Sequence, residues 1–163
     1  MRYTLILMRH AKSSWDDPML ADHDRPLNKR GRASARAMGD WLREIGEVPD
    51  ACISSDSART QETFKQLQLD IPLRVTNRLY HAGPSAILAE LRRETQETVL
   101  VIGHNPGIAE LAEGLVKKPP QHDRFEDYPT CATTVIRFET SRWNDIGWHS
   151  GQPIQFAIPR DVM

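Results

Sequence analysis

The chain has 163 residues, of which 39% are apolar and 26% charged, and its net charge at pH 7 is −1. This length suits one domain over residues 1–163, and such a domain buries roughly 70% of the surface of its unfolded chain. The composition excludes a collagen-like or disordered chain. The near-zero charge provides no field that would recruit nucleic acid or a membrane, so neither partner is expected.

Two cysteines, Cys52 and Cys131, are too few for a disulfide framework or a cysteine-rich zinc site. We expect two free thiols in strands, while one disulfide between them is also compatible with the sequence. The apolar residues 1–8 are followed at once by Arg9. Such a short stretch predicts neither a signal peptide nor a membrane span, and the expected location is cytoplasmic.

Apolar runs alternate with helical patterns along the chain, which predicts a parallel sheet covered by helices. Residues 3–8 are continuously apolar, as is typical of a central strand buried on both faces. The polar residues 12–26 are expected to form a long loop, a kind of segment that often carries function. Residues 28–45 have apolar side chains at helical spacing, and Gly46 ends that helix.

The later elements follow the same alternation. A short strand over 51–54 precedes a helix through about Leu67, which Ser55 or Asp56 is expected to cap. The other expected elements are a strand over 73–76 near a sheet edge, a helix from Pro84, a strand over 98–102, a helix from Pro106, a loop over 117–129 and strands over 131–138 and 154–158.

A histidine directly follows each of the two most apolar strands, His10 after the first and His104 after the strand over 98–102. In open α/β sheets, ligands bind beyond the carboxyl ends of the strands. One such histidine would ordinarily be a packed or surface residue. The same placement at two strand ends predicts that both histidines face one crevice.

Arg59 is expected in the first turn of the helix after the strand over 51–54. A helix N-terminus already carries partial positive charge, so a cation there suggests a bound anion, with an ordinary surface arginine as the alternative. The helix from Pro106 provides a second positive terminus beside His104. Together with Arg9, these groups predict a pocket for a tetrahedral oxyanion.

This set of groups suits phosphoryl transfer. The sequence has no Gly-rich phosphate loop and no clear cluster of metal-binding carboxylates, so guanidinium groups must neutralise the phosphoryl oxygens. A neutral imidazole can attack phosphorus, a second can hydrogen-bond the oxygens, and water then hydrolyses the phosphohistidine. No cofactor is expected. No metal is expected either, because His10 and His104 lack a clear third ligand.

The chain resembles the histidine phosphatase superfamily (phosphoglycerate mutase-like) in four motifs that occur in family order. The resemblance implies a three-layer α/β/α fold with a mostly parallel central sheet. The short length and the segments Lys12 to Trp15 and Asp24 to Leu27 are similar to its SixA-type phosphohistidine phosphatase branch. The four motifs are Arg9-His10-Ala11, Asn28-Lys29-Arg30-Gly31, Ser54 to Thr60 and Gly103-His104-Asn105-Pro106.

The resemblance implies that His10 is the nucleophile and that Arg9, Arg59 and His104 complete the phosphate pocket. Arg25 matches a position that lines the site in the SixA-type branch. The substrate-binding candidates are Arg25, Ser13, Asn105 and His81.

The sequence departs from the family pattern at the proton donor. Other branches place a Glu soon after an Arg-Leu pair, whereas here Arg78-Leu79 is followed by Tyr80 and His81. Acid phosphatases have Asp after the second histidine, whereas here that position is Asn105. An alkoxide leaving group needs an acid, but the imidazole of phosphohistidine takes up its own proton near neutral pH. The missing acid therefore favours a phosphoramidate substrate.

The first hypothesis is a metal-independent phosphatase acting on phosphohistidine in a protein, such as a phosphotransfer domain. One alternative is a phosphatase for a small phosphomonoester or pyrophosphate, with His81, Asp22 or Asp24 as the acid. A second alternative is a non-catalytic module that recognises a phosphorylated partner. The complete set of catalytic motifs argues against the second alternative, because binding alone needs no nucleophile.

Overall fold

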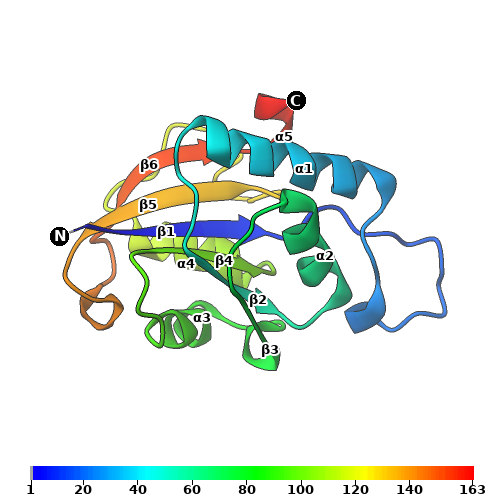
Figure 1. Cartoon of the computed structure of the whole chain (residues 1–163), viewed down its shortest axis with the longest axis horizontal. Coiled ribbons are helices and arrows are strands. Elements are labelled where there is room, and N and C mark those ends of the chain that lie inside the picture. The colour runs from blue at the N-terminus through cyan, green and yellow to red at the C-terminus, as the bar shows by residue number, and fades with distance from the viewer. Residues whose placement is uncertain (1) are drawn as a thin grey trace.

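A six-stranded sheet lies between two layers of helices in the computed structural model, which describes residues 2–163 of the chain (Figure 1). Met1, which belongs to the expected domain, lies outside the described residues. The strands are β1 (Arg2–Arg9), β2 (Ala51–Ser55), β3 (Leu73–Thr76), β4 (Thr98–Gly103), β5 (Thr133–Glu139) and β6 (Gln152–Ala157). The helices are α1 (Lys29–Glu44), α2 (Ala58–Leu67), α3 (Pro84–Leu91), α4 (Gly107–Leu115) and α5 (Pro159–Val162), with short 3₁₀ helices at Asp22–Asp24, Asn77–Leu79 and Trp143–Asp145.

The strand order is β3-β2-β4-β1-β5-β6. The first four strands pair in parallel, while β5 and β6 add two antiparallel pairs at one side. The expected α/β fold with a mostly parallel central sheet is therefore confirmed, and β3 lies at the edge as predicted.

Apolar side chains fill a core on each face of the sheet. Leu5 and Leu7 of β1 pack in the core that contains the apolar residues of α3 and α4. Ile6 and Met8 pack in the core that contains those of α1 and α2. All four side chains are fully buried. Two covered faces explain why this strand is continuously apolar rather than alternating.

Two local predictions were wrong. The cap of α2 is Ser57, whose Oγ accepts the Thr60 N–H, rather than Ser55 or Asp56. Cys131 precedes β5 instead of lying within it, because its φ of +65° belongs to the left-handed region and not to a strand. Cys52 does lie in β2, and both cysteines are buried and free.

None of the helices within residues 2–163 combines the length and the apolar character needed to cross a bilayer.

Candidate active site

His10 and His104 lie side by side because the strands that precede them are neighbours. In the parallel pair of β1 and β4, Arg9 stands opposite Gly103. The backbone N–H of His10 continues the ladder to the Gly103 carbonyl at 3.0 Å. The two imidazole centroids are 5.3 Å apart. The sheet thus brings together two histidines that are 94 positions apart in the sequence.

The His10 ring is arranged as a neutral nucleophile. Its Nδ1 lies 2.7 Å from the Ala11 carbonyl, which can only accept, so Nδ1 carries the hydrogen. The lone pair is then on Nε2, which accepts from Arg59 Nε at 3.3 Å. Burial, reinforced by the nearby Arg9 and Arg59 charges, lowers the pKa of His10 to about 3. The imidazole is therefore uncharged at neutral pH.

Arg59 joins the histidines to the long loop after β1. It is the second residue of α2, and its side chain is buried. Its Nη1 donates to the Asp22 carbonyl at 2.7 Å, and its Nη2 lies 3.0 Å from Asp22 Oδ2 and 3.3 Å from His104 Nδ1. The guanidinium therefore contacts both imidazole rings and the Asp22 carboxylate, and the binding of an external oxyanion by Arg59 stays a prediction.

His104 is also held neutral. Arg59 can only donate, so His104 Nδ1 accepts and Nε2 carries the hydrogen, which it donates to Ser55 Oγ at 2.8 Å. Burial lowers the pKa of His104 to about 3, and electrostatic interactions with His10 and Arg59 add smaller effects in the same direction. Ser55, at the end of β2, thereby orients the second histidine.

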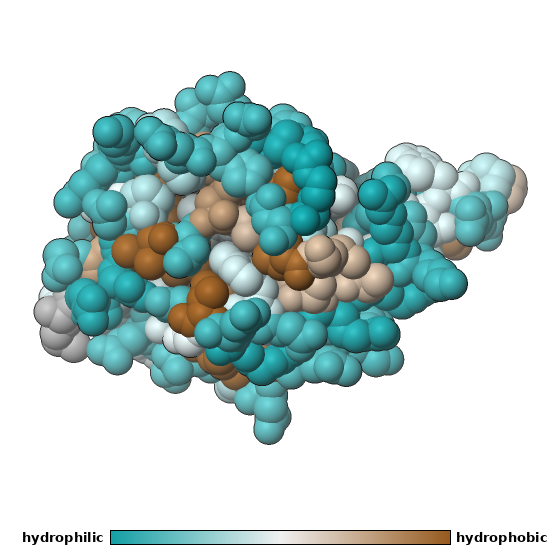
Figure 2. Space-filling view, turned by 90° about the horizontal axis from the view of Figure 1, so that it is seen from above, coloured by the Kyte–Doolittle hydropathy of each residue, from teal (hydrophilic) through white to brown (hydrophobic). Residues whose placement is uncertain are grey.

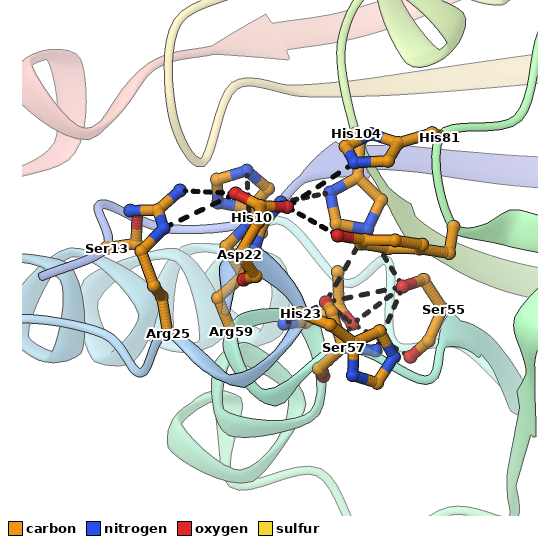
Figure 3. A network of polar contacts seen from close by, with 12 residues as sticks. His10, Ser13, Asp22, His23, Arg25, Ser55, Ser57, Arg59, His81 and His104 are labelled. Atoms are coloured by element: carbon orange, nitrogen blue, oxygen red, sulfur yellow. Dashed lines mark hydrogen bonds and ion pairs between the residues drawn. The ribbon is translucent and has the colours of Figure 1, made fainter. Parts of the chain in front are cut away.

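The carboxylate of Asp22 occupies the centre of this network, between Arg25 on one side and His81 and His104 on the other (Figure 3). Oδ1 accepts from Arg25 at 3.1 Å, and Oδ2 accepts from the Tyr80 hydroxyl at 2.5 Å and lies 3.4 Å from His81 Nε2. Although burial opposes ionisation, the hydrogen bonds from Tyr80, Arg59 and Arg25 hold the pKa of Asp22 well below its ordinary value. Asp22 is thus an internal anion on the arginines and no proton donor in this state.

We expect Asp22→Asn to tighten the binding of inorganic sulfate or phosphate by roughly two- to fivefold. The free carboxylate competes with an incoming oxyanion for Arg25 and Arg59, and the amide does not. Competitive inhibition of para-nitrophenyl phosphate hydrolysis measures the change. Asp24→Asn is the matched control, because the Asp24 carboxylate pairs only with His23, at 3.7 Å. Weaker oxyanion binding by Asp22→Asn would show that the carboxylate instead orients the two arginines for the ligand.

The eight residues proposed as catalytic or substrate-binding line one pocket of about 280 Å³, whereas the two carboxylates proposed as acids, Asp22 and Asp24, are not among its lining residues. Ser13 Oγ accepts from Arg25 at 2.7 Å, and the Arg25 guanidinium lies 3.6 Å from the centre of the Trp15 ring. Within residues 2–163, Arg9 Nε and Asn105 Oδ1 are buried without a hydrogen-bond partner. The lining residues are Arg9, His10, Lys12, Ser13, Trp15, Arg25, Arg59, His81, His104, Asn105 and Thr130.

The sequence analysis missed two polar partners in this site. Ser55 was expected as a helix cap, although its place at the end of a parallel strand next to β4 is a signal that would have pointed to the crevice. Tyr80 follows a 3₁₀ turn, and no pattern marked it. Asp24, one of the proposed acids, is bonded away from the pocket, toward His23. Among residues 2–163, no group of three or more His, Cys, Asp or Glu side chains is placed to hold a metal ion.

Binding of a dianion should be coupled to proton uptake. In the free pocket His104 is neutral, with a pKa of about 3. An oxyanion between the arginines and His104 favours the imidazolium, so its pKa rises and the complex takes up protons near neutral pH. Calorimetric titration with sulfate at pH 6.5, in buffers of different ionisation enthalpy, measures this uptake. His104→Gln should abolish it, and a buffer-independent enthalpy for the unmodified protein would contradict it.

Comparison with known proteins agrees with this geometry. Residues 5–82 match the model of the histidine phosphatase superfamily (branch 1). An uncharacterized protein of Mycobacterium tuberculosis (strain ATCC 25618 / H37Rv) is 35% identical over 160 residues, which cover 94% of this chain and 100% of that protein.

Two solved structures, both assigned as the phosphohistidine phosphatase SixA, have the same fold. The protein from Nakamurella multipartitia has a TM-score of 0.85 and 29% identity, covering 98% of this chain and 97% of that one. The protein from Agrobacterium tumefaciens has a TM-score of 0.78 and 25% identity, covering 96% and 99%. The chain belongs to the histidine phosphatase superfamily, in its SixA-type branch, and is a phosphatase.

Proposed function

We propose that this phosphatase removes the phosphoryl group from phosphohistidine in proteins, with His10 as the nucleophile and without a metal. The state of Asp22 carries the proposal. Its carboxylate contacts Arg25 and Arg59, and hydrogen bonds from Tyr80, Arg59 and Arg25 keep its pKa well below the ordinary value against the effect of burial. The pocket therefore favours a substrate whose leaving group needs no positioned acid.

The first step transfers the phosphoryl group to the enzyme. His10 Nε2 attacks phosphorus, the new N–P bond forms, and the N–P bond of the substrate breaks. A substrate imidazole protonated on its other ring nitrogen leaves as a neutral ring. An alkoxide would need a proton at the departing oxygen, so the same site should hydrolyse alkyl phosphates slowly.

The second step returns the enzyme to its starting state. Water attacks the phosphorus on His10, the Nε2–P bond breaks, and phosphate and one proton are released. His10 Nδ1, which lies 2.7 Å from the Ala11 carbonyl, keeps its hydrogen during phosphorylation. Phosphorylated His10 therefore has a protonated second ring nitrogen, as the substrate's phosphohistidine does, and it too leaves as a neutral ring. Arg9, Arg25 and Arg59 neutralise the phosphoryl oxygens in both steps.

The loop after β1 supports a protein substrate. Figure 2 shows a largely hydrophilic face with a segment projecting from one end, and Figure 1 places this loop at the same end. The side chains of Trp15 and Met19 are 75% and 89% exposed, and Trp15 also lines the catalytic pocket. Large apolar groups exposed at the rim of a site are typical of contact with a macromolecule. The two solved relatives assigned as SixA support the same substrate class.

A rapid-quench comparison in EDTA tests the proposal. The substrates are a phosphotransfer domain phosphorylated on histidine and glycerol 2-phosphate, an alkyl ester whose leaving group needs a proton. We expect kcat/KM for the phosphorylated domain to be at least about a hundredfold higher, with acid-labile phosphate trapped on the enzyme. Comparable turnover of the alkyl ester would support the small-molecule alternative. Bound phosphate without turnover or covalent phosphate would support the recognition module.

Met19→Ser with Leu20→Ser should lower kcat/KM for the phosphorylated domain roughly tenfold, because two exposed apolar contacts on the loop after β1 are lost. Turnover of free phosphohistidine should change much less, since it is too small to reach Met19. Trp148→Ala is the matched control, because Trp148 is 49% exposed and does not line the pocket. An equal loss on both substrates would place the effect in the pocket rather than in docking.

A further inference from the structure

A second pocket of about 270 Å³ adjoins the catalytic one. Four cationic side chains line it, and no carboxylate does. These side chains are Lys12, Arg30, Arg124 and Arg160. Lys12 and Thr130 line both pockets, so the two are adjacent.

Asp127 and Asp161 lie close enough to Arg124 and Arg160 to offset part of the positive charge of this pocket. Arg124 Nε pairs with Asp127 at 3.0 Å. Within the described part of the chain, Lys12, Arg30 and Arg160 make no ion pair and no side-chain hydrogen bond. Asp161, the neighbour of Arg160, is held by His122 at 2.8 Å and by the Ile158 N–H at 3.0 Å. Because three of the four lining cations make no ion pair within residues 2–163, the pocket keeps a positive potential that attracts an anion.

The fold seats this pocket beside the nucleophile. The start of α1 packs on the segment after His10, because the Asn28 N–H donates to the Lys12 carbonyl at 3.0 Å. A Cβ at Gly31 would lie only 2.1 Å from that carbonyl oxygen, so only glycine permits this approach. Lys12 and Arg30 are thereby held near each other, and Lys12 is two positions after His10 in the sequence.

We propose that this second pocket binds another anionic group of the substrate while the phosphoryl group is at His10. The preferred substrate then carries a phosphoryl group and a second anion close to it. That anion is either a second phosphate on a small molecule or an acidic side chain that flanks phosphohistidine. The inference rests on the proposed function, because it takes His10 as the point of phosphoryl transfer.

Four substrates separate these possibilities. Two are phosphohistidine peptides, with either glutamate or glutamine flanking the phosphorylated residue. The other two are phenyl phosphate and hydroquinone bisphosphate. Each is assayed with the unmodified enzyme, with Arg30→Gln/Arg160→Gln, and with Lys29→Gln/Lys118→Gln. The last pair removes the same charge from exposed positions that do not line the pocket.

We expect the unmodified enzyme and the Lys29/Lys118 control to prefer the two-anion member of at least one pair by roughly tenfold to a hundredfold in kcat/KM. Arg30→Gln/Arg160→Gln should reduce that ratio to near one and leave the single-anion substrates unchanged. The pair that shows the preference identifies the source of the anion. If the aryl pair shows the preference, the His10→Ala enzyme, which does not turn these compounds over, should bind hydroquinone bisphosphate more tightly than phenyl phosphate by the same factor.

No preference in either pair, or a preference that survives Arg30→Gln/Arg160→Gln, would overturn the inference. Failure of the proposed function looks different. In that case the glutamine-flanked phosphohistidine peptide is turned over no faster than phenyl phosphate, whatever the ratio within each pair.

Discussion

Replacing His10 with alanine is expected to abolish the covalent phosphoenzyme and to lower kcat by at least roughly 10⁴-fold, because no other group can take over a nucleophile's role. His10 presents a lone pair on Nε2, fixed by the bond of Nδ1 to the Ala11 carbonyl. His104 is not expected to replace it, because its Nε2 is bonded to Ser55 at 2.8 Å. Rapid quench with ³²P-labelled substrate, followed by acid and alkali treatment, measures the loss.

His149→Ala is the matched control for this prediction, because His149 is exposed and lies outside the catalytic pocket. It should retain both the activity and the labelled intermediate. Substrate and oxyanion binding should survive in His10→Ala, since Arg9, Arg25 and Arg59 remain. Acid-labile phosphate on the His10→Ala enzyme would show that another residue is the nucleophile.

Arg59→Gln is expected to lower kcat/KM by roughly 10³-fold, the size of effect seen when a preorganised donor is removed from a developing oxyanion. The Arg59 guanidinium contacts His10 Nε2, His104 Nδ1 and the Asp22 carboxylate at 3.0–3.3 Å. A glutamine has neither the charge nor the fork to hold a phosphoryl group among them. Arg59→Lys should also lose most of the activity, because a point charge cannot donate in three directions.

Arg43→Gln serves as the control, since Arg43 lies on the exposed side of α1 and pairs there with Asp40. Steady-state kinetics should be read beside thermal melts, because Arg59 is buried. A variant that folds normally and retains more than about a tenth of kcat/KM would show that Arg9 and Arg25 suffice.

The strand ends that hold the catalytic pair were predictable from the sequence. Residues 3–8 are apolar except for Thr4, which favours a central strand buried on both faces, and His10 then stands near its carboxyl end. The same argument places His104 after β4. The first-turn position of Arg59 added that residue, the motif resemblance added Arg25, and all of these residues line one pocket.

Element boundaries and hydrogen-bond partners that depend on backbone torsion angles were harder to predict from the sequence. Cys131 was expected in a strand because its apolar side chain fits the pattern, but its positive φ and its N–H bond to the His10 carbonyl place it in the turn before β5. Ser55 was expected as a cap because caps and strand-end ligands use the same residue types. Its Oγ instead bonds to His104.

The sequence by itself determined the family, the order of most elements and a set of residues that line one pocket, because these depend on local periodicity and on motifs of fixed spacing. Only the tertiary structure decided the charge state of the site. Asp22 is an internal anion because the loop after β1, whose conformation no local pattern predicts, places it against Arg25, Arg59 and Tyr80. The cationic pocket beside the nucleophile likewise arises from four separate segments that the fold brings together. Such electrostatic relations depend on distances across the fold, which no local pattern encodes.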